Sequence, residues 1–268
     1  MNQDSNQDVS HALENGESDR DYSWAPDPGT DSRPKAKARF TPYVTFALLG
    51  LTILIYLLQM GSEALLGYDV PAALGVKENQ RIAMGEFWRL ITPILLHGSI
   101  LHIGFNMYAL YIFGPSMERY FGRSRFLSLY LLAGFAGNVF SMMFTPAPSL
   151  GSSTAIFGLI GAHGIFIYQN RSLFGENFTR RALTRIIQVA AINLLIGLSP
   201  GIDNWGHIGG LFGGVIFTWL GGPLLTPSPT PLGLELTDKR TSGEVIQAIA
   251  ITAGFFVFLT AGALLLRN

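Results

Sequence analysis

Long apolar runs constrain this chain more than any other feature of its sequence. The first run covers Tyr43–Met60, and others follow at about 98–118, 125–145, 153–169, 182–199, 206–222 and 244–266. A helix of about 20 residues rises about 30 Å, which is the thickness of the hydrocarbon core of a bilayer. Charged residues make up only 13% of the 268 residues and hydrophobic residues 49%, whereas a soluble domain carries about 25% charged residues. We predict an all-α polytopic membrane protein with seven transmembrane helices.

The segments outside these runs predict the domain organisation. Residues 1–39 are rich in Asp, Asn, Ser and Pro, so we expect a disordered, cytoplasmic N-terminal tail. Residues 61–97 mix apolar and charged side chains, which predicts a loop with short helices at the membrane interface. Residues 223–243 contain a Pro-rich stretch and predict a cytoplasmic linker. The linker divides a six-helix core at 40–222 from an additional C-terminal helix at 244–268.

The distribution of Lys and Arg predicts the orientation in the membrane. If the N-terminus is cytoplasmic, 14 of these residues fall on the cytoplasmic side and four on the other. Cytoplasmic loops are usually the ones enriched in Lys and Arg, so we expect the N-terminus inside and, after seven crossings, the C-terminus outside. The tail lacks the pattern of a removable signal peptide, and the first run is interpreted as an uncleaved anchor. These features favour a bacterial-type plasma membrane.

Composition excludes several classes of function. The formal net charge is zero, so there is no basic surface that would bind nucleic acid. The chain has no cysteine, which excludes a disulfide framework, a thiolate zinc site and a cysteine nucleophile. His97 and His102 are five residues apart and there is no H-E-x-x-H sequence, so no metal or other cofactor is expected. An aspartyl protease is disfavoured because no pair of carboxylates lies in the apolar runs.

Three apolar runs bring polar residues to one predicted depth. His102 and Asn106 lie in the second run, Ser153 begins the fourth, and His207 begins the sixth. Polar residues are costly inside a membrane and usually face a cavity or one another. His102 and Asn106 are four residues apart, so both lie on one helix face and can donate hydrogen bonds to an oxyanion. Small residues at four-residue spacing in the fourth and sixth runs allow close helix packing, which predicts that Ser153 and His207 are neighbours.

Each of these residues also has a purely structural interpretation. Ser153 alone is what a helix N-cap looks like, His207 alone could line a helix contact, and Asn106 alone could hydrogen-bond between helices. Together, these interpretations do not explain the shared depth, order and spacing. His163, in the middle of the fourth run, has no motif around it, and we expect a packed or hydrogen-bonded structural role. An unrelated transporter or channel is a further alternative, but it would favour inverted repeats that are not evident here.

Five motifs occur in a fixed order across residues 40–222. They are Trp88-Arg89, the segment from His97 to Asn106, Glu118-Arg119, Gly151-Ser152-Ser153 followed by Phe157-Gly158, and Gly206-His207 followed by Gly209-Gly210. In these motifs the chain resembles the rhomboid family of intramembrane serine proteases. An additional C-terminal helix is a known variant of that family.

The resemblance implies that Ser153 is the nucleophile and that His207 is the general base and then the general acid. It implies that Asn106, His102 and the Ser153 backbone N–H stabilise the oxyanion. The family commonly has Gly after the nucleophile, where this chain has Thr154. Thr is acceptable in a first helical turn, and we expect its hydroxyl to bond back to the backbone.

Further residues of these motifs are implied to support the site. Phe157 would pack on the catalytic imidazole, and Gly151 belongs to the serine motif. Trp88, Arg89 and Glu118 resemble structural ties, and His97 would form hydrogen bonds or retain water near the site. The expected function is hydrolysis of peptide bonds in or near transmembrane segments of membrane proteins. The expected partners are single-pass transmembrane substrates and the lipid bilayer. The alternative is a catalytically inactive rhomboid-like protein that binds transmembrane helices.

Overall fold

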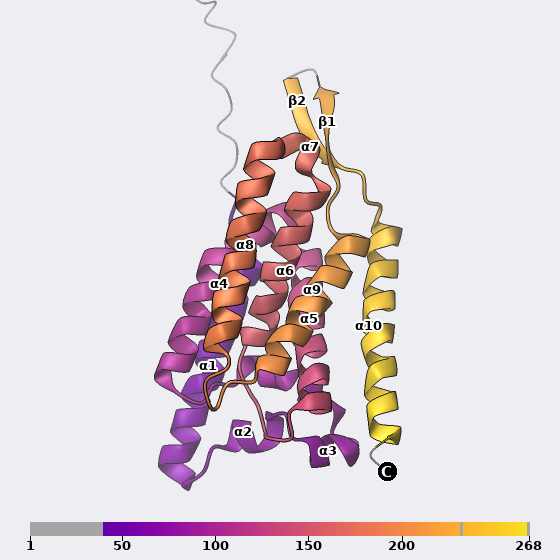
Figure 1. Cartoon of the computed structure of the whole chain (residues 1–268). Coiled ribbons are helices and arrows are strands. Elements are labelled where there is room, and N and C mark those ends of the chain that lie inside the picture. The colour runs from indigo at the N-terminus through magenta and orange to yellow at the C-terminus, as the bar shows by residue number, and fades with distance from the viewer. Residues whose placement is uncertain (1–39, 231–232, 267–268) are drawn as a thin grey trace, which may run out of the picture. The chain divides into compact units, whose positions relative to one another are not determined.

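The computed structural model describes residues 40–230 and 233–266, and the predicted N-terminal tail at 1–39 lies outside them. The described chain is mostly helical, and each of the seven predicted runs lies in one long helix (Figure 1). These helices are α1 (Tyr43–Leu66), α4 (Ile100–Phe121), α5 (Arg123–Phe144), α6 (Ser153–Gln169), α8 (Glu176–Ile196), α9 (Asn204–Gly221) and α10 (Ser242–Leu265). A short helix, α7 (Arg171–Phe174), joins α6 to α8.

Within the described residues, three helices are long and apolar enough to cross a membrane by length and composition: α1, α5 and α10. The other four long helices carry features that weaken this signal. α6 has only 17 residues, α4 and α9 contain His102, Asn106 and His207, and α8 contains several arginines. In α4 and α9 these polar residues are predicted site residues. The count of seven crossings therefore stays a prediction.

Close packing of α6 against α9 depends on glycines. A Cβ atom added to Gly210 would overlap the carbonyl oxygen of Thr154, and one added to Gly214 would overlap the carbonyl oxygen of Gly158. Small residues let two helix backbones approach in this way. Figure 1 shows α6 in the middle of the long helices, with α1 and α4 on one side and α10 on the other. The start of α6 is thereby held beside the start of α9.

The segment between α1 and α4 forms the short helices that its composition predicted. They are α2 (Val70–Gly75), α3 (Asn79–Ala83), and the 3-10 helices η1 (Phe87–Leu90) and η2 (Thr92–Leu95). The buried guanidinium of Arg89 pairs with Glu86 at 2.6 Å and donates to the carbonyl oxygens of Val76 and Ala73 at 2.9 and 2.8 Å. The indole N–H of Trp88 donates to Leu74 O at 3.0 Å. These bonds join η1 to α2, so the segment has a defined structure.

Glu118 of α4 joins that helix to the start of α1. Its carboxylate accepts the backbone N–H groups of Val44 and Thr45 at 3.0 and 2.8 Å, and the hydroxyl of Thr45 at 2.8 Å. The N–H groups of a first helical turn have no partners within their own helix, and Pro42 at the N-cap supplies no side-chain bond. A buried carboxylate from a different helix therefore caps α1.

The predicted linker at 223–243 contains a β-hairpin, which corrects the expectation of an all-α chain. Strand β1 (Leu225–Thr230) pairs antiparallel with β2 (Gly233–Asp238), with Leu225 opposite Asp238. Proline lacks an N–H donor, so β1 with Pro227 and Pro229 suits a sheet that has only edge strands. The hairpin is tied to the helices by an ion pair of 2.7 Å between Arg125 and Asp238. It leads into α10. The ring of the buried Phe256 in α10 packs near that of Phe140 in α5, with 6.2 Å between the ring centroids.

Candidate active site

The backbone before α6 places Ser153 at the first position of that helix. The preceding residue, Ser152, occupies the N-cap position, although its side chain makes no capping bond. Gly151 has φ of 132°, a conformation that favours glycine. Its N–H donates to Pro93 O at 2.9 Å, and Ser149 pairs with Lys77 through two backbone hydrogen bonds of 3.0 and 3.1 Å. Ser153 is therefore not the N-cap, and its hydroxyl is available for another partner.

That partner is His207 of α9. The His207 Nε2 atom lies 3.0 Å from the Ser153 Oγ atom. The ring of Phe157, one turn after Ser153, lies parallel to the imidazole with a centroid distance of 4.3 Å and an interplanar angle of 10°. The buried Nδ1 atom of His207 has no hydrogen-bond partner among residues 40–230 and 233–266. The serine and the imidazole thus form a pair without a carboxylate, and an aromatic ring holds the plane of the imidazole.

His102 of α4 lies near this pair, and Asn106 lies one turn further along the same face of that helix. Asn106 is buried, and within residues 40–230 and 233–266 neither its amide nor the His102 imidazole makes a side-chain hydrogen bond. The His102 ring lies against Gly151, because a Cβ atom on that glycine would be 2.7 Å from His102 Nε2 and 3.6 Å from Ser153 Oγ. Side-chain N–H donors without partners beside a serine hydroxyl suit an anion that forms during a reaction.

His97 lies in the loop before α4, next to Ser152 and His102. Its Nε2 atom is 3.3 Å from the hydroxyl of Ser152, and its ring centroid is 5.0 Å from that of His102. Its backbone N–H donates to Gln59 Oε1 at 3.0 Å. Burial first, and then the neighbouring His102, lower the pKa of His97 to about 3. A neutral His97 therefore supports the serine loop at ordinary pH.

Thr154 occupies the position after Ser153, where the family commonly has glycine. Two residues that pack against the Thr154 side chain from other helices are glycines. A Cβ atom on Gly137 of α5 would lie 2.5 Å from the Thr154 Cβ atom, and one on Gly206 of α9 would lie 3.1 Å from its methyl group. The side chain thus packs between α5 and α9. Among the described residues its buried hydroxyl has no hydrogen-bond partner, so the bond back to the backbone that the sequence allows is not formed.

Asp203, which was not among the predicted site residues, fixes the start of α9. Its carboxylate caps the helix by accepting the Gly206 N–H at 3.1 Å. It also accepts the Thr145 hydroxyl at 2.8 Å and the Ser141 hydroxyl. Burial raises the pKa of Asp203, but these hydrogen bonds and the nearby Ser149 outweigh burial and hold it below its usual value. An Asp three residues before a helical N–H is an N-cap signal that could have identified it.

The remaining predicted residues are spread around the site. His163 is half-buried on α6 and lines an apolar groove, while Trp88, Arg89 and Glu118 make the contacts between elements described above. In the described part of the chain, no three His, Cys, Asp or Glu side chains gather into a group that could hold a metal ion.

Comparison with known proteins shows which family this chain belongs to. A domain family described as Rhomboid domain matches residues 84–224. Rhomboid protease GluP of Bacillus subtilis is 44% identical over 218 residues, which are 81% of this chain and 40% of that protein. RHOMBOID-like protein 5 of Arabidopsis thaliana is 33% identical over 195 residues, 69% of this chain and 62% of that protein.

A further relative has a length closer to that of this chain. YdcA of Bacillus subtilis is 32% identical over 185 residues, which are 68% of this chain and 89% of that protein. By contrast, the chain spans less than two thirds of the length of GluP and of the Arabidopsis protein. The matched domain includes α4, α5, α6, α8 and α9, the helices that carry or surround Ser153 and His207. The chain belongs to the rhomboid family.

Proposed function

We propose that this protein is an intramembrane serine endopeptidase that cleaves peptide bonds in or near transmembrane segments of other membrane proteins. The observation that carries the proposal is the 3.0 Å contact between Ser153 Oγ and His207 Nε2, with Phe157 stacked on the imidazole. A serine hydroxyl is almost fully protonated at neutral pH and needs an adjacent base to act as a nucleophile. A neutral imidazole at hydrogen-bonding distance supplies that base.

The reaction proceeds by two transfers at the same serine. Ser153 Oγ attacks the scissile carbonyl carbon while His207 Nε2 takes the hydroxyl proton. The resulting imidazolium gives this proton to the leaving amine as the peptide C–N bond breaks, which leaves an ester on Ser153. Water then attacks the ester while His207 takes a proton from it, and His207 returns this proton to Ser153 Oγ as the ester bond breaks and the carboxylic acid product leaves. Without a partner at Nδ1, the imidazole depends on packing against Phe157 for its orientation.

The oxyanion of each tetrahedral intermediate needs hydrogen-bond donors. The Asn106 amide, the His102 imidazole and the Ser153 backbone N–H are proposed to supply them. The absence of competing side-chain hydrogen bonds for Asn106 and His102 among the described residues supports this role. Loss of one oxyanion donor raises the activation free energy by about 3 kcal/mol.

The proposed organisation in the membrane has seven crossings. The catalytic core at 40–222 contributes six, and α10 adds the seventh after the linker and hairpin. The N-terminus would face the cytoplasm of a bacterial-type cell and the C-terminus would face outside. α6 rises only about 24 Å, less than the bilayer hydrocarbon, which supports a Ser153 that lies below the outer surface. Substrates are proposed to be single-pass proteins whose helix unwinds locally, because an intact helix hides its carbonyl groups in internal hydrogen bonds.

The test is cleavage of a generic single-span substrate in liposomes. The wild-type protein should cleave it, and Ser153→Ala and His207→Ala should not. Ser172→Ala is the control, because it removes an exposed hydroxyl outside the site and should leave the activity unchanged. Equal cleavage by all the variants would disprove the dyad. If the folded wild-type protein cleaves nothing and yet retains a transmembrane peptide, the inactive rhomboid-like alternative is the correct one.

Orientation needs its own experiment. A reporter that is active only outside the cytoplasm, fused after Asn268, should be active. Fusion of the same reporter to the α7 region is the control and should be silent. A silent reporter after Asn268 would overturn the seven-crossing proposal without affecting the proposed chemistry.

A further inference from the structure

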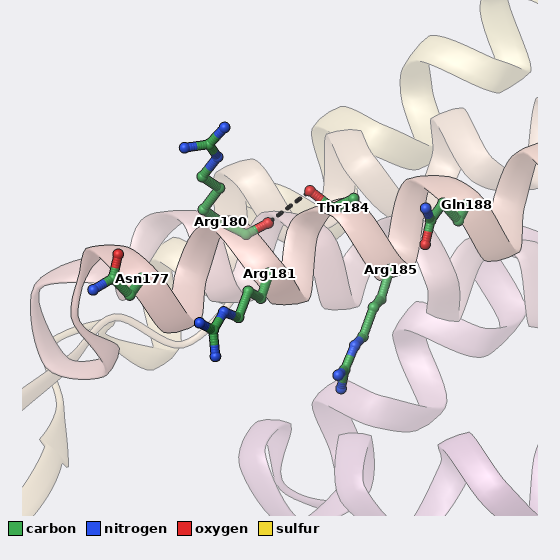
Figure 2. A pocket seen from close by; sticks show the side chains of 6 residues that line it. All are labelled: Asn177, Arg180, Arg181, Thr184, Arg185 and Gln188. Carbon is green, nitrogen blue, oxygen red and sulfur yellow. Dashed lines mark hydrogen bonds between the residues drawn. The ribbon is translucent and has the colours of Figure 1, made fainter.

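Helix α8 carries a basic surface that the proposed reaction does not use. Three arginines of this helix, Arg180, Arg181 and Arg185, line a hollow. In Figure 2 the side chains of Arg181 and Arg185 project on one side of the helix and that of Arg180 on the other. Asn177, Thr184 and Gln188 complete the lining of the hollow. No ion pair among residues 40–230 and 233–266 includes any of the three arginines. Arginine stays charged in proteins, so the positive charge on this surface has no ion-pair partner within the described part of the chain.

A second, apolar groove adjoins this hollow. It is formed by α8 together with α4 and α6, and its apolar lining is Phe113, Ile160, Ile167, Phe178, Ala182, Ile186 and Val189. Arg181 and Arg185 line both the basic hollow and the apolar groove. They are one turn apart and therefore lie on one face of α8. A ligand that contacts both arginines would have its charged part in the hollow and its apolar part in the groove.

The groove has room for a hydrocarbon chain. Its volume is about 450 Å³, within the range of about 300–1,000 Å³ typical of ligand pockets. Apart from His163 and the two arginines, its lining is apolar. An extended acyl chain therefore suits this groove better than a polar ligand does.

Most of the surface of α8 is exposed to the surroundings of the protein, which in a membrane are lipid. Thr179 is its one buried residue, and large apolar side chains such as Phe178 and Ile187 are exposed at 54% and 66%. In a membrane protein, an exposed apolar helix face contacts lipid. A lipid can reach the groove by lateral diffusion, and its headgroup would meet the arginines where the helix leaves the hydrocarbon.

We propose that Arg181 and Arg185 bind the phosphodiester of an anionic phospholipid whose acyl chain lies in the groove between α4, α6 and α8. Guanidinium groups bind phosphate oxygens through two parallel N–H donors, and these charge-assisted bonds are stronger than neutral ones. An anionic headgroup adds net attraction that a zwitterionic headgroup lacks, because the latter carries its own cation. The site does not require Ser153 or His207 and is independent of the proposed protease activity.

The experiment measures lipid bound to the purified full-length protein by native mass spectrometry. The protein in detergent is titrated with dioleoyl phosphatidylglycerol or dioleoyl phosphatidylcholine. The wild-type protein should prefer phosphatidylglycerol, and the Arg181→Gln/Arg185→Gln variant should bind it about tenfold more weakly, which is the loss expected for a charge-assisted contact. The matched control is Arg119→Gln/Arg171→Gln, which removes equal charge from residues outside both hollows. Equal weakening by the two variants would overturn the site in favour of general surface charge.

Two further arms separate the lipid from other anions. Ala182→Trp fills the groove without changing any charge and should also weaken phosphatidylglycerol binding; Val189→Trp replaces it if the first variant does not fold. Excess inorganic phosphate should displace little of the lipid. Full displacement by phosphate would indicate a simple anion site, and displacement by an acidic transmembrane peptide would indicate a protein ligand. Either result would overturn the lipid proposal.

Discussion

Gly151 and His102 fit together because Gly151 has no side chain. A Cβ atom at Gly151 would lie 2.7 Å from His102 Nε2, closer than real Cβ contacts, and the φ of 132° strains any other residue. Gly151→Ala should therefore displace His102 and the serine loop, and should lower kcat at least about tenfold while the helices stay folded. Gly85→Ala is the matched control, because Gly85 also has positive φ, at 100°, but no neighbour within 4 Å. Equal losses in the two variants would show that strain alone, without His102, accounts for the effect.

Asn106→Ala should lower kcat by about 10²-fold with little change in KM, because an oxyanion donor acts mainly in the transition state. The measurement is steady-state cleavage in detergent with a fluorogenic transmembrane substrate. Thermal unfolding serves as the control, since Asn106 makes no side-chain bond in the described structure whose loss would destabilise it. A rise in KM at constant kcat would assign Asn106 to substrate binding.

Phe157→Leu should slow cleavage by about three- to tenfold, because parallel stacking is worth about 0.5–1.5 kcal/mol and here orients His207. Phe157→Tyr keeps the ring and should restore most of the rate. Labelling of Ser153 by a fluorophosphonate probe should fall in parallel with cleavage. If labelling is unchanged in Phe157→Leu, the ring contributes to substrate contact and does not orient the base.

Glu118→Ala should destabilise the protein by about 2 kcal/mol, because it leaves three hydrogen-bond donors at the start of α1 without their acceptor. Thermal unfolding in detergent would measure the loss. Glu63→Ala removes an exposed carboxylate of α1 and serves as the control. Cleavage per folded molecule should be unaffected at low temperature; a loss of activity without a loss of stability would contradict a structural role.

The buried His97 should make stability depend on pH. Its pKa is about 3 in the folded protein and about 6.5 when unfolded, so between these values the unfolded chain binds a proton that the folded chain does not. The contribution to the free energy of unfolding is therefore fully present above about pH 6.5 and decreases as the pH falls toward 3. His97→Gln should reduce this dependence in urea titrations of detergent-solubilised protein. Parallel curves for the two proteins would rule out His97 as the titrating group.

Much of the helical architecture could be predicted, because long apolar runs and their glycines determine where helices form and pack. The contact between Ser153 and His207 was predictable for the same reason, since glycines at four-residue spacing bring α6 and α9 together. The catalytic roles of these residues remain proposals. The hairpin was not predicted, because Pro227 and Pro229 indicate an extended linker, and only its long-range pairing with β2 makes β1 a strand.

The packing of Thr154 was also beyond the sequence. Its surroundings are Gly137 and Gly206, which lie on two other helices, so no local pattern reveals the space that they provide. Asp203 gave a local capping signal, but its bonds to Ser141 and Thr145 join residues about 60 positions apart. Such contacts follow from the tertiary fold and cannot be read from spacing.

The length of α6 couples the proposed chemistry to the membrane itself. If α6 crosses the membrane as proposed, its 17 residues are too short for a bilayer of ordinary thickness, and such a hydrophobic mismatch is relieved by local thinning of the lipid. A thicker bilayer would place Ser153 deeper and lengthen the path that hydrolytic water must travel. Acyl-chain length in the host membrane would then regulate this protein without any change in its sequence.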